Sequence, residues 1–193
     1  MAIQKLIDHF KDYLPLNKIE IEDLSSRCRP KKVKRRQFLL TQGEICRNYN
    51  FVVQGCFKMY KMDEATKEHN ILFACENEWI TDIGSFHTDK ASELYIEAVE
   101  PSSVLQINKA DLIHLYKTHP KFDRNFRVII ENKFIELQNR LLQTISSSAE
   151  ERYLLFLEQY PHLQNRLPNT QIASYLGITP EFLSRIRSNL SRR

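Results

Sequence analysis

The segment at positions 169–186 limits the possible folds of this chain most strictly. It reads NTQIASYLGITPEFLSRI, which is typical of two short helices that cross at a tight turn. Crossing helices need a small residue at their closest approach, and Ala173 supplies it. Gly177, four positions later, tolerates the positive φ of such a turn. The segment therefore predicts a helix-turn-helix.

The ends of both helices also carry recognisable signals. We expect Asn169 or Thr170 to cap the first helix, and Thr179 to cap the second, with Pro180 at its first helical position. The apolar residues that would hold the pair together are Ile172, Leu176, Ile178, Leu183 and Ile186.

The second helix offers polar groups suited to the major groove of DNA. Arginine reads the edge of guanine there, and a glutamate accepts a hydrogen bond from cytosine. We therefore predict base contacts from Glu181, Ser184 and Arg185. Contacts to the DNA backbone are predicted for the remaining hydroxyl, amide and basic side chains: Ser174, Thr179, Arg187, Ser188, Asn189, Arg192 and Arg193. The alternative is a helical hairpin that contacts protein only.

The charge distribution supports the DNA interpretation. The chain of 193 residues has a net charge of +4, and positions 161–193 hold five arginines against the single acid Glu181. The whole surplus therefore lies around the second helix, where it suits a polyanion. A second basic run, Arg27 to Arg36, is interpreted as the solvated face of a strand, with contact to DNA or an acidic partner as the alternative.

The first half of the chain has β-rich runs separated by turns. Strands are expected at 37–41, 49–53, 57–61, 69–74, 94–99 and 104–107, after helices at 3–13 and 19–27. Gly43, Gly55 and Gly84 lie between these runs. This pattern predicts an antiparallel roll or barrel.

A long helix is predicted from Pro120 to about Ile145. Its main apolar row comprises Phe126, Ile130, Phe134, Leu137, Leu141 and Ile145, and a second row comprises Val128, Ile135 and Leu142. Two rows favour pairing with a second copy of the helix, and burial on two sides within one chain is the alternative. Three serines at 146–148 then break the pattern, and Ser148 is expected to cap a helix that ends at Tyr160.

A β-roll, a long helix and a C-terminal helix-turn-helix, in this order, resemble the Crp/Fnr family of bacterial transcription regulators. The resemblance implies an α+β fold with a cyclic-nucleotide-binding-like sensor at 1–118, a dimerisation helix at 119–146 and a DNA-binding domain at 147–193. It implies a cytoplasmic homodimer on a pseudo-palindromic site, with RNA polymerase and an unknown small-molecule effector as candidate partners. Glu181 and Arg185 match base-reading positions of the family, whereas Pro180 stands where many members have arginine.

The expected effector pocket departs from the nucleotide-binding pattern. Family members that bind cyclic nucleotides use an arginine for the phosphate and a glutamate for the ribose. Alignment on Gly84 and Phe86 puts Asp82 and Ser92 at these positions, next to Ser85. Serine cannot neutralise a phosphate, and substitution by the nearby Lys90 is the alternative. We therefore hypothesise that the pocket is degenerate and that cyclic AMP is not the effector.

Other functional classes receive little support. The four cysteines, Cys28, Cys46, Cys56 and Cys75, form no CxxC pair, so no metal site or other cofactor is predicted, although a thiol switch stays open. Neither a signal peptide nor a membrane-spanning run is present. No catalytic motif was found, so an enzyme is not expected. A ligand-binding module whose C-terminal helices contact protein is the alternative function.

Overall fold

The computed structural model describes residues 2–192, which form two compact units. The first comprises Met1–Lys61 and Leu72–Glu131, and the second comprises Met62–Ile71 and Asn132–Arg193. The second unit thus joins a β-hairpin from the first half of the sequence to the C-terminal helices.

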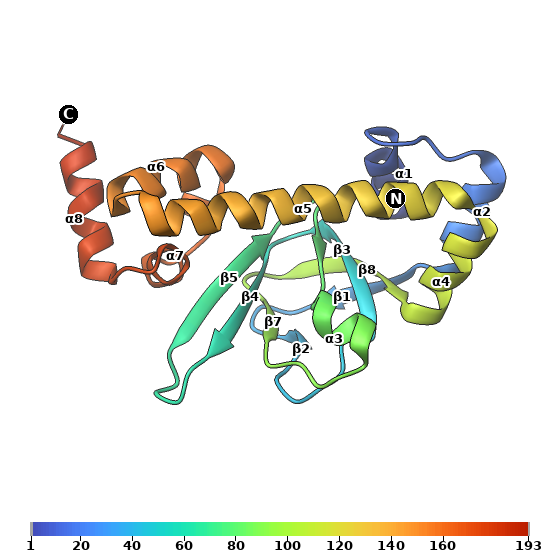
Figure 1. Ribbon diagram of the computed structural model, residues 1–193, viewed down its shortest axis with the longest axis horizontal. Helices are drawn as coiled ribbons and strands as arrows, with labels where there is room; N and C mark the ends of the chain where they lie inside the picture. The colour runs from blue at the N-terminus through green and yellow to red at the C-terminus, as the bar shows by residue number, and fades with distance from the viewer. Residues whose placement is uncertain (1, 193) are drawn as a thin grey trace. The chain divides into compact units, whose positions relative to one another are not determined.

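Two four-stranded antiparallel sheets form the predicted roll (Figure 1). One has the order β1-β8-β3-β6 and the other β2-β7-β4-β5. Their strands are β1 (Arg29–Val33), β2 (Phe38–Leu40), β3 (Asn48–Gln54), β4 (Phe57–Met62), β5 (Glu68–Ala74), β6 (Trp79–Ile80), β7 (Tyr95–Ala98) and β8 (Ser102–Asn108). All six expected strands are present within a residue or two. The edge strand β1 lies within the basic run Arg27 to Arg36. Its residues Arg29 and Lys32 are exposed, as the interpretation of a solvated strand expects.

One predicted turn glycine is held by close packing. Gly55, between β3 and β4, has φ +96°, a backbone conformation that side chains disfavour. A Cβ built at this position would lie 2.1 Å from Oγ of Ser102. Only glycine fits between the turn and β8.

The helices of the first unit begin at local capping signals. They are α1 (Ala2–Lys11), α2 (Lys18–Arg27), α3 (Ile83–Thr88) and α4 (Lys109–Thr118). Asn17 and Glu20 form a complete capping box at α2. Asn108 caps α4, and its side chain accepts from the amide of Asp111.

The first turns of α5 (Pro120–Ser146) belong to the core of the first unit. Phe126 is 1% exposed, and its ring lies 5.0 Å from Trp79 and 5.9 Å from Phe10 between centroids. Asn125 is fully buried and bonds both backbone groups of Leu14. Phe126, predicted as part of a face between two copies, is instead used inside the chain because this aromatic cluster covers it.

The helices of the second unit follow the predicted pattern closely. They are the rest of α5, α6 (Ala149–Gln159), the 3₁₀ turn η1 (Leu163–Asn165), α7 (Asn169–Leu176) and α8 (Pro180–Leu190). Ser148 caps α6, and Thr179 caps α8 with Pro180 in its first turn, as expected. Gly177 ends α7 with φ +68°. The capping prediction for α7 is wrong, because Pro168 occupies the N-cap and no side chain bonds there.

Candidate nucleic-acid interface and effector region

The outer face of α8 presents the predicted base-reading side chains to solvent. Glu181, Ser184 and Arg185 are exposed, as are Ser188 and Asn189. The guanidinium of Arg185 lies 5.2 Å from the ring centroid of Phe182, which is itself 40% exposed. Hydrogen bonds from its own backbone amide and from the Thr179 hydroxyl lower the pKa of Glu181, so its carboxylate is charged at neutral pH. This face therefore presents one exposed cation and one exposed anion to solvent.

Arg187, two residues after Arg185, points into the domain. Its Nε donates to the hydroxyl of Tyr153 at 2.8 Å, and its Nη1 donates to Oδ1 of Asn169. Its Nη2 is buried without a hydrogen-bond partner. Arg187 therefore joins α8 to α6 and α7, and this placement favours a bracing role over the predicted contact to DNA.

The predicted backbone contacts fall into two groups. Thr179, Ser188, Asn189 and Arg192 are exposed. Ser174 on α7 is occupied, since its hydroxyl donates to the carbonyl of Glu68 at 2.6 Å and accepts from the amide of Asn70 at 3.0 Å. Arg193 lies outside the described residues.

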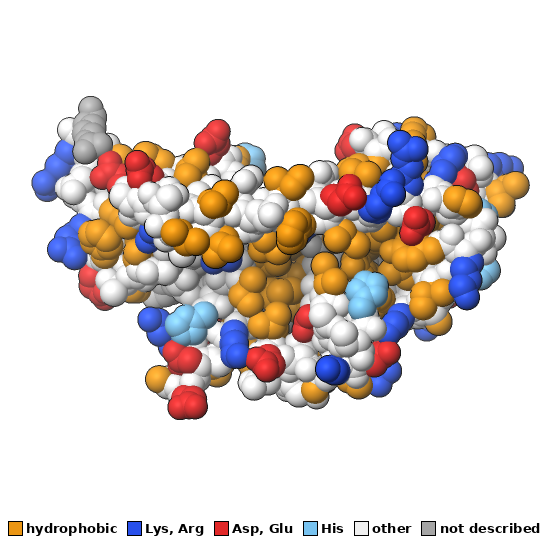
Figure 2. Space-filling model, in the orientation of Figure 1, with side chains coloured by type: hydrophobic (Ala, Val, Ile, Leu, Met, Phe, Trp, Pro, Cys, Tyr) orange, Lys and Arg blue, Asp and Glu red, His pale blue; other side chains and the backbone are white. Residues whose placement is uncertain are grey.

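The C-terminal half of α5 has an exposed apolar face. Its large side chains are Phe134, Ile135, Leu137, Leu141, Leu142 and Ile145, with exposed fractions from 41% to 76%. Figure 2 shows hydrophobic side chains along this helix at the surface. Except for Phe126, which is buried, and Val128 and Ile130, which are half-buried, the residues of the two predicted rows lie on this face.

The residues predicted for the effector pocket bond to one another. Oδ2 of Asp82 accepts from the hydroxyl of Ser92 at 2.6 Å. Oδ1 of Asp82 accepts from the backbone amide of Ser85, and Asp82 thereby caps α3. The Ser85 hydroxyl donates to the carbonyl of Lys90 at 2.6 Å and accepts from the amide of Cys46 at 2.9 Å. Ser92 is 3% exposed. Gly84 lies within α3, where an added Cβ would come no closer than 3.4 Å to Asp82.

Several other features bear on possible cofactors. Burial raises the pKa of the Cys28 thiol to about 12, so it is a poor nucleophile at neutral pH. Among residues 2–192, no group of three or more His, Cys, Asp or Glu side chains is placed to hold a metal ion. Within the same range, no helix is both long and apolar enough to cross a membrane.

Three residues important for the second unit were not predicted from the sequence: Asn70, Arg140 and Gln171. Asn70 is 3% exposed and donates to both the carbonyl and the side-chain oxygen of Gln171. These contacts join positions about a hundred residues apart, so no local pattern could indicate them.

The family comparison matches residues 30–119 to the cyclic nucleotide-binding domain. A search of curated proteins gives no match. Among solved structures, FixK2 from Bradyrhizobium japonicum is similar with a TM-score of 0.75 and 17% identity, over 86% of this chain and 85% of that one. The c-di-GMP responsive global regulator CLP from Xanthomonas campestris has a TM-score of 0.74 and 13% identity, over 91% and 92%.

A third solved structure carries the family name that the sequence suggested. A crp/fnr family transcriptional regulator from Eubacterium rectale has a TM-score of 0.70 and 15% identity, over 95% of this chain and 88% of that one. Residues 30–119 match the cyclic nucleotide-binding domain, and the chain has the fold of the Crp/Fnr regulators. The resemblance inferred from the sequence is thus confirmed at the level of the fold.

Proposed function

We propose that this protein is a homodimeric, sequence-specific DNA-binding transcription regulator. The observation that carries the proposal is the outer face of α8, where Glu181, Ser184 and Arg185 are exposed on a capped second helix. A recognition helix presents its first turns to base edges in this way. Thr179, Ser188, Asn189 and Arg192 flank these residues and suit phosphate contacts.

The exposed apolar face of α5 supports pairing of two copies. Six large apolar side chains on a single helix exceed the scattered exposure that is normal for a monomer. A two-fold dimer presents two recognition helices to two half-sites about one turn of DNA apart. The proposal therefore includes a pseudo-palindromic site. RNA polymerase and a small-molecule effector other than cyclic AMP remain predicted partners.

Selection of bound duplexes from a random pool, followed by titration of the selected site, tests DNA recognition. We expect Arg185→Ala to weaken binding of the selected site by ~10–100-fold while changing binding of an unrelated duplex little, because one base contact contributes about 1–3 kcal/mol. The matched control is Arg192→Ala, which removes the same charge from an exposed position and should weaken both duplexes alike. If Arg185→Ala leaves the selected site unaffected, α8 is not the reading helix.

A second experiment tests the dimer. Leu141 is 61% exposed, so Leu141→Asp should leave the fold intact while placing a charge in the proposed seam. Sedimentation should show a monomer, and affinity for the selected site should fall more than 100-fold. Glu131→Asp, an exposed position on the same helix, is the control. A dimer of unchanged stability in Leu141→Asp would contradict the seam.

If the purified protein selects no duplex from the pool, the alternative of a ligand-binding module with protein-binding helices gains support.

A further inference from the structure

The hairpin between β4 and β5 is attached to the first helix of the helix-turn-helix. Glu68 and Asn70 provide the hairpin side of this contact, and Gln171 and Ser174 provide the α7 side. The Gln171 amide donates to the Glu68 carboxylate at 2.9 Å and accepts from Nδ2 of Asn70 at 2.8 Å. Both bonds of the Ser174 hydroxyl also go to the hairpin. Five hydrogen bonds thus join two segments that both belong to the second unit.

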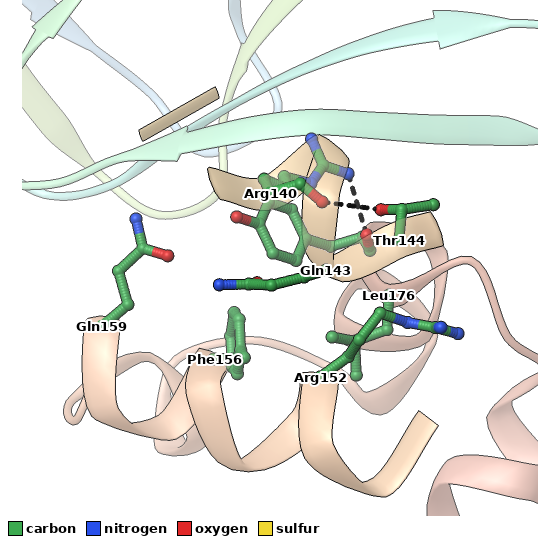
Figure 3. A pocket seen from close by; sticks show the side chains of 8 residues that line it. Arg140, Gln143, Thr144, Arg152, Phe156, Gln159 and Leu176 are labelled. Carbon is green, nitrogen blue, oxygen red and sulfur yellow. Dashed lines mark hydrogen bonds between the residues drawn. The ribbon is translucent and has the colours of Figure 1, made fainter. Parts of the chain in front are cut away.

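Arg140 of α5 also binds both the hairpin and α7. Its guanidinium donates to the carbonyls of Asn70, Ile71 and Tyr175, and it lies 4.0 Å from the centroid of the Tyr175 ring. Figure 3 shows Arg140 reaching from α5 toward the strand drawn above it, while Arg152 points away.

The cavity beside Arg140 and Arg152, about 10 Å³, has room for a single water molecule and for no effector. Burial lowers the pKa of Arg140, and no carboxylate pairs with it in residues 2–192, so its role is to order backbone.

The hairpin also borders the start of the recognition helix. One groove is lined by Lys67 and Glu68 from the hairpin and by Thr179, Pro180 and Glu181 from the turn and α8. The hairpin therefore lies along the edge where phosphates would approach under the proposed function.

The charge of the hairpin opposes an approaching polyanion. The part of the hairpin in the second unit, Met62–Ile71, carries three carboxylates, Asp63, Glu64 and Glu68, against Lys67 as its single lysine. Hydrogen bonds from His69 and from backbone amides lower the pKa of Asp63, so its carboxylate is ionised at neutral pH. DNA docked against α7 would meet both occupied hydrogen-bonding groups and like charge.

We infer that the hairpin is an autoinhibitory latch, which holds α7 in a state that competes with DNA for Ser174 and Gln171. The inference rests on the proposed function and names the regulation of the same site. Apparent affinity falls by the fraction of molecules in the competent state. A latch closed in about nine molecules of ten therefore weakens DNA binding ~10-fold, and its release restores that factor.

Hairpin substitutions test the latch without altering any proposed DNA contact. Asn70→Ala removes the amide bonds to Gln171, and Glu68→Ala removes the carboxylate that accepts from it. Glu64→Ala is the matched control, because it deletes an equal charge from the exposed tip of the same hairpin. Asn70 is buried, so Asn70→Ala could fold poorly. Glu68 is only half-buried, so Glu68→Ala keeps the test valid in that case.

Two measurements are made on the full chain. Fluorescence anisotropy with a labelled duplex of the selected site reports affinity, and hydrogen exchange reports the backbone amide of Asn70, which donates to Ser174. We expect both latch variants to bind the duplex ~5–10-fold more tightly than wild type and the Glu64→Ala control. We also expect the Asn70 amide of wild type to exchange faster when the duplex is added.

The outcomes separate the latch from the proposed function. If wild type and both variants bind the selected duplex equally, or if Glu64→Ala binds as tightly as Glu68→Ala, the latch is overturned and the regulator stands. Slower exchange of the Asn70 amide on adding duplex also overturns the latch, since DNA would then bind the closed state. If no variant binds any duplex, the proposed function fails, and control of DNA binding fails with it.

Discussion

The outer face of α8 and the cluster around Asp82 are both polar sites, and they differ in how their groups are used. On α8, Glu181, Arg185 and Asn189 face solvent with few partners inside the chain. Around Asp82, the carboxylate and the Ser92 hydroxyl bond each other, and Ser92 is buried. A ligand competes with water at the first site and with existing hydrogen bonds at the second.

This difference shows why residue type alone is a poor guide to binding. A buried donor or acceptor that already has a partner gains nothing from a ligand unless the ligand replaces that partner. The same distinction operates within α8, where Arg185 is free and Arg187 is used by Tyr153 and Asn169.

The largest effect on stability is expected for Arg187→Ala. The substitution leaves the hydroxyl of Tyr153, which is 3% exposed, without this donor, and it should lower the free energy of unfolding by about 1–3 kcal/mol. Urea denaturation measures it, with Arg185→Ala as a control expected within about 0.5 kcal/mol of wild type. Equal losses in the two variants would show that both arginines are used alike.

A smaller effect is expected for Ser92→Ala in the closed cluster. Loss of the bond to Asp82 should lower the free energy of unfolding by about 1 kcal/mol. In isothermal titration, neither wild type nor the variant should give measurable heat with cyclic AMP, because position 92 carries no cation in either protein. A micromolar dissociation constant for wild type would contradict the hypothesis of a degenerate pocket.

The smallest effect at neutral pH is expected for Tyr49→Phe. The Tyr49 hydroxyl is buried without a hydrogen-bond partner, so its removal should change stability by less than about 1 kcal/mol at pH 7. Burial raises the pKa of Tyr49 to about 12. An unfolded tyrosine ionises near pH 10, so wild type should lose stability relative to the variant between about pH 10 and 12. Parallel stability curves across this range would show that Tyr49 ionises freely in the folded protein.

The predictable parts of the fold carried local signals. Ser148, Thr179 and Gly177 mark helix ends by chemistry that acts within four residues, and each marks the end observed. The two-residue strand β6 and the short helix α3 were not predicted, because two to six residues are too few to show a period. Pro168 stands at the cap of α7 in place of Asn169, whose side-chain oxygen instead accepts from Arg187.

The candidate site was predictable in its residue types and less so in its orientations. The α8 residues predicted to contact DNA are exposed, with Arg187 as the exception. A side chain on the border between two helix faces can point to solvent or into the domain. Arg187 points into the domain because it donates to Tyr153, 34 residues earlier in the sequence. The attachment of Asn70 to α7 depends on contacts between distant segments, which the sequence does not encode locally.

The two halves of α5 divide one helix between two environments, with Phe122 and Phe126 in a core and Leu141 to Ile145 in solvent. If a second copy covers the exposed half, as proposed, folding and association share one free energy. The melting temperature then becomes a function of protein concentration. Dilution alone would weaken the fold, and the amount of protein in the cell would set how much of it is competent to act.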